Sequence, residues 1–85
     1  MEHILHILEA QIVEGFIIKV RFDNGKTKTV NAMPLLKGPV FEPLKSLKEF
    51  QKLSVDTISR TLVWPNGADL APETLFNLNE EKISA

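Results

Sequence analysis

The chain has 85 residues, of which 44% are hydrophobic and 25% are charged, with no Cys and a formal net charge of −1. This length and apolar fraction fit one globular domain over residues 1–85 and exclude an intrinsically disordered chain. The lack of Cys excludes a disulfide framework, a thiolate metal site and a cysteine nucleophile, and the small net charge argues against a basic protein that coats DNA or membranes.

The first third of the sequence predicts three antiparallel strands. Apolar and polar side chains alternate over residues 8–13 and, after a turn at residues 14–15, over residues 16–22, which is the period of a half-buried strand. Residues 23–25, Asp-Asn-Gly, are typical of a hairpin turn because Asn and Gly tolerate positive φ. The β-branched and polar residues 26–31 therefore predict a third strand near the edge of the sheet.

The middle of the sequence predicts a loop followed by one short helix. Prolines and a glycine interrupt residues 33–44, which favours a loop. Leu44, Leu47 and Phe50 then recur at a spacing of three among lysines and glutamates, which is one apolar stripe of a helix. Pro43 suits the first turn of that helix, where its missing N–H costs nothing.

The last third predicts a second hairpin and a short helical turn. Residues 53–56 and 60–64 have the composition of strands, and the turn residues 65–67 follow the second of them. Pro72 is typical of a first helical turn, and the flanking leucines at positions 70 and 75 are placed for a hydrophobic staple. The polar and acidic residues 77–85 predict a frayed tail.

These elements predict a small α+β domain with a mainly antiparallel sheet of about five strands in two hairpins, one main short helix and a short C-terminal helical turn. The predicted core consists of Leu8, Ile12, Phe16, Ile18, Val20, Phe22, Leu44, Leu47, Phe50, Val55, Leu62 and Trp64. Such a core is only marginally sufficient for a chain of this length. We therefore expect some apolar side chains to be exposed and shared with a partner or a second copy, namely Ile4, Ile7, Ile17, Leu35 and Phe41.

The segment from Trp64 to Leu75, WPNGADLAPETL, resembles the signature that closes members of the bacterial family Domain of Unknown Function 2442. Residues 22–25 resemble the first hairpin turn of that family, and residues 38–44 resemble its central loop entering a helix, which ends on an aromatic residue, here Phe50. The resemblance covers residues 5–76. Position 71 departs from it, because Ala stands where an acidic residue is typical, so no capping or cation-binding role is carried over to that position.

The resemblance implies a compact α+β domain of a kind found in small stand-alone bacterial proteins. Some members are similar to the fixed neighbour of another small protein, as in toxin–antitoxin pairs, and others are fused to a DNA-binding helix-turn-helix. No catalytic residues are established for the family. Neither His lies in a context typical of a catalytic triad, and no two carboxylates pair convincingly. We therefore expect a protein-protein interaction or regulatory module, not an enzyme, and no cofactor.

The candidate partner surface consists of Phe41, Trp64, Asn66 and Asp69, from the central loop and the turn after the single tryptophan. The same residues fit a structural role. Asp69 is suited to an Asx turn or a helix cap, and Trp64 is suited to covering the core edge with its N–H bonded. A small-ligand site beside Trp64 is a third alternative.

The small net charge conceals a basic middle, because residues 15–52 hold eight basic and three acidic residues, whereas residues 1–14 and 53–85 each carry −3. Nucleic-acid binding through this middle is therefore the alternative function. The candidate patch consists of Lys19, Arg21, Lys26 and Lys28, joined by Lys45, Lys48 and Lys52. The strand face that carries these residues has few aromatic side chains on which bases could stack, so a solvated sheet face is the favoured interpretation.

His3 and His6 are the only histidines. A strand points them to opposite faces, and a metal site needs three or four converging ligands, so we expect solvated side chains and no metal. No apolar run is long enough for a signal peptide or a membrane span. We therefore expect a cytoplasmic protein that does not interact with membranes.

Overall fold

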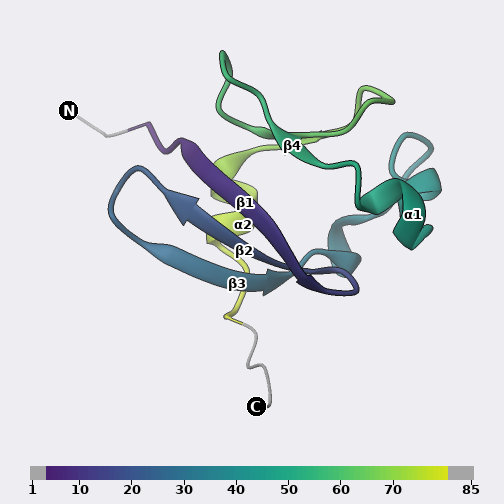
Figure 1. Cartoon of the computed structure of the whole chain (residues 1–85), viewed down its shortest axis with the longest axis horizontal. Coiled ribbons are helices and arrows are strands. Elements are labelled where there is room, and N and C mark those ends of the chain that lie inside the picture. The colour runs from purple at the N-terminus through teal and green to yellow at the C-terminus, as the bar shows by residue number, and fades with distance from the viewer. Residues whose placement is uncertain (1–3, 81–85) are drawn as a thin grey trace.

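The computed structural model describes residues 4–80, which form two three-stranded antiparallel sheets linked by an irregular segment (Figure 1). In each sheet every strand pairs with the next one along the chain, so the orders are β1-β2-β3 and β4-β5-β6. The strands are β1 (Ile7–Glu14), β2 (Ile17–Phe22), β3 (Thr27–Asn31), β4 (Ser54–Val55), β5 (Leu62–Val63) and β6 (Asp69–Leu70).

We name residues 32–53, which link the two sheets, the crossover segment. The helical elements of the chain are the 3₁₀ turns η1 (Met33–Leu35) and η2 (Glu42–Lys45), helix α1 (Leu47–Phe50) and helix α2 (Pro72–Phe76). The first three lie in the crossover segment, and α2 follows β6. The α+β class with antiparallel strands and short helices is therefore confirmed.

The predicted count of about five strands in two hairpins is not matched exactly, because β6 is a sixth strand that the sequence pattern does not indicate. The turn residues 65–67 do not end the second hairpin. The chain reverses there, with the Trp64 N–H donating to the Ala68 carbonyl at 2.9 Å and Gly67 in the left-handed region at φ 92°. Asp69 and Leu70, which follow Ala68, thereby pair with β5 as a third strand. A two-residue strand carries too little alternation to be recognised from sequence.

The predicted phase of β1 is wrong at its first residues. Ile7 is fully buried and Leu8 is 40% exposed, the reverse of the prediction. The pairing shifts between Ile7 and Glu9, which is a β-bulge: an extra residue in β1 moves the side chains before it to the other face. Ala10 and Ile12, beyond the bulge, are half-buried against the core as the alternation predicts.

The single helix predicted around Leu44, Leu47 and Phe50 is divided in two. Ser46 has an extended backbone, with φ −79° and ψ 123°, and separates η2 from α1. Leu44 and Phe50 are buried, but Leu47 is 44% exposed, because the break removes it from the apolar stripe. The prediction that Leu47 belongs to the core is therefore wrong.

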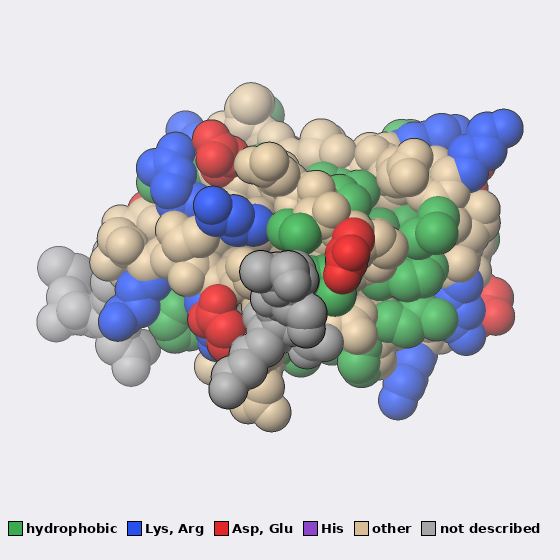
Figure 2. Space-filling model, turned by 60° about the horizontal axis from the view of Figure 1, so that its bottom comes forward, with side chains coloured by type: hydrophobic (Ala, Val, Ile, Leu, Met, Phe, Trp, Pro, Cys, Tyr) green, Lys and Arg blue, Asp and Glu red, His purple; other side chains and the backbone are tan. Residues whose placement is uncertain are grey.

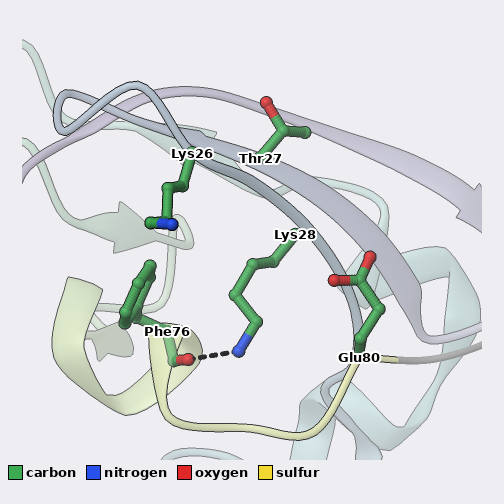
Figure 3. Close-up of a pocket in the computed structure, with 5 residues that line it drawn as sticks. All are labelled: Lys26, Thr27, Lys28, Phe76 and Glu80. Atoms are coloured by element: carbon green, nitrogen blue, oxygen red, sulfur yellow. Dashed lines mark hydrogen bonds between the residues drawn. The ribbon is translucent and has the colours of Figure 1, made fainter.

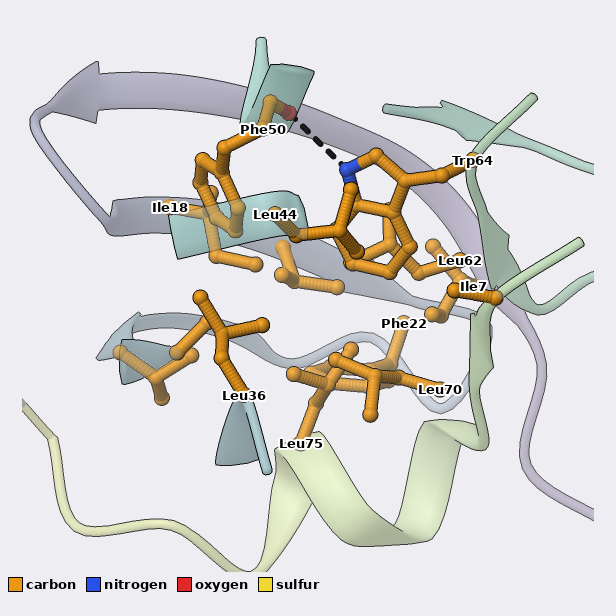
Figure 4. Close-up of a cluster of buried hydrophobic side chains, with 14 residues drawn as sticks. Ile7, Ile18, Phe22, Leu36, Leu44, Phe50, Leu62, Trp64, Leu70 and Leu75 are labelled. Carbon is orange, nitrogen blue, oxygen red and sulfur yellow. Dashed lines mark hydrogen bonds between the residues drawn. The ribbon is translucent and has the colours of Figure 1, made fainter. Parts of the chain in front are cut away.

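One hydrophobic cluster takes side chains from both sheets, the crossover segment and α2 (Figure 4). The predicted core residues that are buried are Ile18, Val20, Phe22, Leu44, Phe50, Leu62 and Trp64, and Ile12, Phe16 and Val55 are partly buried against them. The cluster also contains Ile7, Val30, Ala32, Leu36, Ala68, Leu70 and Leu75, which were not predicted. Of the apolar residues expected at the surface, Ile4 is 71% exposed, whereas Ile17, Leu35 and Phe41 are half-buried.

The end of the described chain lies against β3. The Lys28 ammonium donates to the carbonyls of Phe76 and Leu78, and the Thr29 N–H donates to the Glu80 carboxylate at 3.2 Å. These bonds place residues 77–80 of the predicted frayed tail beside the sheet. Residues 81–85 lie outside the described residues.

Candidate functional site

The crossover segment carries exposed apolar side chains along much of its length. Met33, Val40 and Leu47 keep 39%, 42% and 44% of their surface exposed. The prolines are exposed too, because they hold the chain in short turns that bury few side chains. We name this set the crossover surface: Met33, Pro34, Pro39, Val40, Pro43 and Leu47. Figure 2 shows hydrophobic side chains gathered on the half of one face that lies toward α1, with lysines and arginines at its margin.

Trp64 fastens the crossover segment to the second sheet. Its indole N–H donates to the Phe50 carbonyl at 3.0 Å, and the side chain is 3% exposed (Figure 4). The indole also meets the ring of Phe50, with centroids 5.7 Å apart, and the ring of Phe41 edge to face, at 6.4 Å. Such aromatic pairs add stabilisation beyond the area that they bury. The ring therefore holds both ends of the η2–α1 region in place.

Asn66 makes a second connection, from the β5–β6 turn to the crossover surface. Its side-chain N–H donates to the Val40 carbonyl at 2.9 Å, and its side-chain oxygen accepts the Ala68 N–H at 3.1 Å. The side chain thus shapes its own turn and fixes the backbone that presents Val40. Asn66 therefore has the Asx-type role predicted for Asp69, and the prediction for Asp69 is wrong.

The structure brings together three of the four residues predicted for the partner surface. Phe41, Trp64 and Asn66 form one connected group, whose contacts hold the crossover segment. Asp69 lies apart from this role, in β6 with an exposed side chain, and the N-cap position of α2 is occupied by Ala71 without a side-chain bond. Because Trp64 is buried and its N–H is bonded, it offers little surface to a partner or to a small ligand.

The basic residues of the first hairpin do not share one face. Lys19 and Arg21 project from the exposed face of β2, where Arg21 lies 3.7 Å from the Glu9 carboxylate. Lys28 pairs with the buried Val20 and therefore projects from the opposite face, which packs on the core. Lys26 lies in the turn before β3. The predicted four-residue basic face is therefore wrong in its geometry, whereas nucleic-acid binding itself stays a prediction.

The Lys28 ammonium is bound by nearby groups of the protein itself. It lies 5.1 Å from the centre of the Phe76 ring and donates at 2.5 Å to the carbonyl of Phe76, the last residue of α2 (Figure 3). It also donates at 2.6 Å to the carbonyl of Leu78, which lies beyond the helix. Carbonyls at the end of a helix lack partners within the helix, and a lysine beside them is favourable. The side chain therefore ties the chain end to the first sheet and is poorly placed to bind a phosphate.

Two of the lysines on the crossover segment are paired with neighbouring glutamates. Lys45 lies 3.2 Å from Glu42, and Lys52 lies 3.2 Å from Glu49. Lys48 is exposed in α1. Exposed pairs of this kind contribute little to stability, and in each pair the glutamate offsets the charge of the lysine.

The remaining candidates lie at the other end of the molecule. His6 and Asp23 form a pair, with the ring nitrogen Nδ1 2.8 Å from a carboxylate oxygen, and Asp23 also accepts the His6 backbone N–H. His3 lies outside the described residues. Within residues 4–80 no group of three His, Asp or Glu side chains is close enough to hold a metal ion.

The sequence pattern does not predict Met33, Val40 and Leu47 as surface residues. Proline spacing was the available signal, since Pro34, Pro39 and Pro43 prevent the continuous helix or strand that would bury a regular apolar stripe. An apolar side chain in such a segment is buried only if another element covers it. The sequence alone does not show which element covers which side chain.

Comparison with known proteins places the chain in a family. A family model described as "Protein of unknown function (DUF2442)" matches residues 7–81. No curated protein and no solved structure matches the chain. Among the described residues no helix has the length and apolar character needed to cross a membrane.

Proposed function

The chain belongs to the DUF2442 family of proteins of unknown function, and we propose that it acts as a protein-binding module without enzymatic activity of its own, with the crossover surface as its contact region. One observation carries the proposal: the exposed apolar side chains of the crossover segment, in which Met33, Val40 and Leu47 each keep about 40% of their surface in water. Each Å² of apolar surface withdrawn from water on binding contributes roughly 25 cal/mol. A gathered set of such side chains marks an interaction site more often than scattered ones do.

The contacts of Trp64 and Asn66 with the crossover segment support the same proposal. The bonds from Trp64 to the Phe50 carbonyl and from Asn66 to the Val40 carbonyl fix a segment that has little regular secondary structure of its own. A surface already held in its binding shape loses less conformational entropy when a partner docks. The buried aromatic group thus positions the exposed residues, and the exposed residues make the contact.

The margin of the surface indicates the chemistry of the partner. Lys37 and Lys48 are exposed and lie between and beside the apolar residues along the crossover segment. A partner with an apolar centre and acidic residues around it would match both features, with the charges acting mainly on the association rate. The further proposal that this partner is the product of an adjacent gene, as in toxin–antitoxin pairs, rests on the family resemblance.

Co-expression with the product of the adjacent gene tests the proposal. We expect the two proteins to co-purify, and we expect the triple variant Met33→Ser, Val40→Ser, Leu47→Ser to weaken the complex about 100-fold, because central apolar contacts dominate interface energies. Ile58→Ser is the matched control, since Ile58 is 91% exposed on the β4–β5 connection, which lies away from α1 in Figure 1.

Failure of the two wild-type proteins to co-purify would contradict the pairing. Equal weakening by the triple variant and by Ile58→Ser would contradict the assignment of the surface. A nucleic-acid function would show itself as binding to DNA or RNA whose affinity falls steeply with salt, as phosphate contacts require. Such binding, in the absence of a protein complex, would replace the proposal with the alternative.

A further inference from the structure

β3 is an edge strand of the first sheet, and within residues 4–80 no further strand pairs with its outward backbone groups. The N–H of Phe22 donates to the Lys26 carbonyl at 2.8 Å, and the N–H of Ala32 donates to the Phe16 carbonyl at 2.9 Å. Because hydrogen-bonded pairs alternate along an antiparallel ladder, the even-numbered residues of β3 bond to β2. The backbone groups of Thr27, Thr29 and Asn31 therefore point away from the sheet.

The first sheet protects its two edges differently. At the β1 edge, the Ile7 N–H donates to the Arg60 carbonyl at 2.9 Å, and β1 also contacts β4. At the β3 edge, the Thr29 N–H donates to the Glu80 carboxylate at 3.2 Å. One edge is thus covered by the second sheet, whereas the other is covered by the side chain of a residue near the chain end.

Two hollows along β3 show that the Glu80 side chain covers only part of this edge. A hollow of about 600 Å³ is lined by Lys26, Thr27, Lys28, Phe76 and Glu80 (Figure 3). A smaller one, of about 210 Å³, lies toward the other end of the strand and is lined by Asn31, Pro34, Leu78 and Asn79. Residues 78–80 thus line parts of both hollows, and space remains beside β3 at both of its ends.

We propose that the β3 edge pairs with the β3 edge of a second copy of this chain, and that Glu80 acts as a latch that opposes this pairing. An antiparallel pair centred on Thr29 places Thr29 opposite Thr29 of the other copy and Thr27 opposite Asn31. All three outward-facing residues then meet outward-facing residues, so their N–H and carbonyl groups are satisfied in both copies. The resulting sheet has six strands and a two-fold axis, the commonest symmetry of homo-oligomers.

The side chains of β3 are compatible with this register. Thr opposite Thr is a favourable cross-strand pair, and Lys28 comes opposite Val30 of the other copy, so no like charges face each other. Lysines usually protect an edge by carrying charge to it. The Lys28 ammonium does not do so here, because it is bound to the Phe76 and Leu78 carbonyls on the core side.

Sedimentation velocity on the full chain, from about 10 µM to 1 mM, tests the proposal. We expect Glu80→Ala to strengthen dimer formation about 25-fold, since one exposed hydrogen bond accounts for about fivefold per copy and two copies open. Glu73→Ala is the matched control, because Glu73 is an exposed glutamate of α2. Its dimerisation constant should equal that of the wild type.

Adding Thr29→Pro to the Glu80→Ala variant assigns the dimer to this edge. The Thr29 N–H is not part of the β2–β3 ladder, so proline removes only an outward donor, and the double variant should return to a monomer. Amide hydrogen exchange gives a second readout without proline: Thr27, Thr29 and Asn31 should become protected as the Glu80→Ala protein is concentrated. A Glu80→Ala protein that stays monomeric up to about 1 mM would overturn the proposal. A dimer that forms without protection of these amides would also overturn it.

Discussion

The two sheets of this protein are each stabilised in a different way. The strands of the first sheet are eight, six and five residues long, and their ladder fixes them through local pairing. The strands of the second sheet are two residues each, and this sheet is secured to the crossover segment by side chains, chiefly Trp64 and Asn66. The difference teaches that an irregular segment can present a defined surface when a few buried side chains replace a backbone ladder.

Trp64→Ala should have the largest effect on stability, because it removes the contacts of the indole with Phe50 and Phe41. We expect a loss of about 3–5 kcal/mol in the free energy of unfolding, as for other buried aromatic truncations, measured by urea denaturation. In hydrogen exchange, the amides of the crossover segment should lose protection more than those of β2. Equal loss in both regions would show that the two sheets are not separately stabilised.

Ile7→Ala and Leu8→Ala test the bulge in the first sheet. Ile7 is fully buried and Leu8 is 40% exposed. We expect the Ile7 variant to lose about 2–4 kcal/mol and the Leu8 variant less than about 0.5 kcal/mol, by the same denaturation measurement. A reversed order would mean that β1 follows a simple alternation without the bulge.

Asn66→Ala should have an intermediate effect on the free energy of unfolding. This effect should be larger than that of Asn24→Ala in the first sheet. It removes the bonds to the Val40 carbonyl and to the Ala68 N–H, and we expect a loss of about 1–2 kcal/mol. Asn24→Ala is the matched control, because the Asn24 side chain accepts the Lys26 N–H within an exposed hairpin turn. Thermal unfolding of the two variants compares them, and an equal loss would contradict a special role for Asn66.

The smallest effect concerns pH and the β4–β5 connection. Hydrogen bonds from the backbone N–H groups of Ile58 and Ser59 lower the pKa of the Asp56 carboxyl below its ordinary value. A lowered pKa in the folded state contributes stability above the unfolded pKa, and this contribution is lost as the pH falls through the folded pKa. The melting temperature should therefore fall slightly less on acidification in Asp56→Asn than in the wild type.

The alternation of apolar residues was sufficient to predict most of the first sheet. Ile18, Val20 and Phe22 are buried as predicted, and the Asp-Asn-Gly turn precedes an edge strand as predicted. The bulge in β1 could not be predicted, because it depends on how β1 pairs with β2. The residue types of β1 are the same with or without a bulge. Local pattern therefore specifies these strands but not a shift in their register.

The crossover segment and the candidate site depend on contacts between residues that are distant in the sequence. The bond from Asn66 to Val40 spans 26 positions, and the bond from Lys28 to Phe76 spans 48. The sequence predicted that Trp64 would cover the core with its N–H bonded, which is confirmed, but its acceptor on Phe50 follows from the three-dimensional arrangement. Exposure of Leu47 likewise depends on the extended backbone at Ser46.

Chemical-shift mapping tests the central proposal, that the crossover surface binds a protein partner, most directly. The isotope-labelled chain is titrated with the unlabelled product of the adjacent gene, and shifts are followed for backbone amides and for the methyl groups of Met33, Val40 and Leu47. We predict that the largest changes fall within residues 33–47, with little change on the exposed face of β2 around Lys19 and Arg21. Changes centred on that face, or no changes at a partner concentration of about 1 mM, would contradict the account.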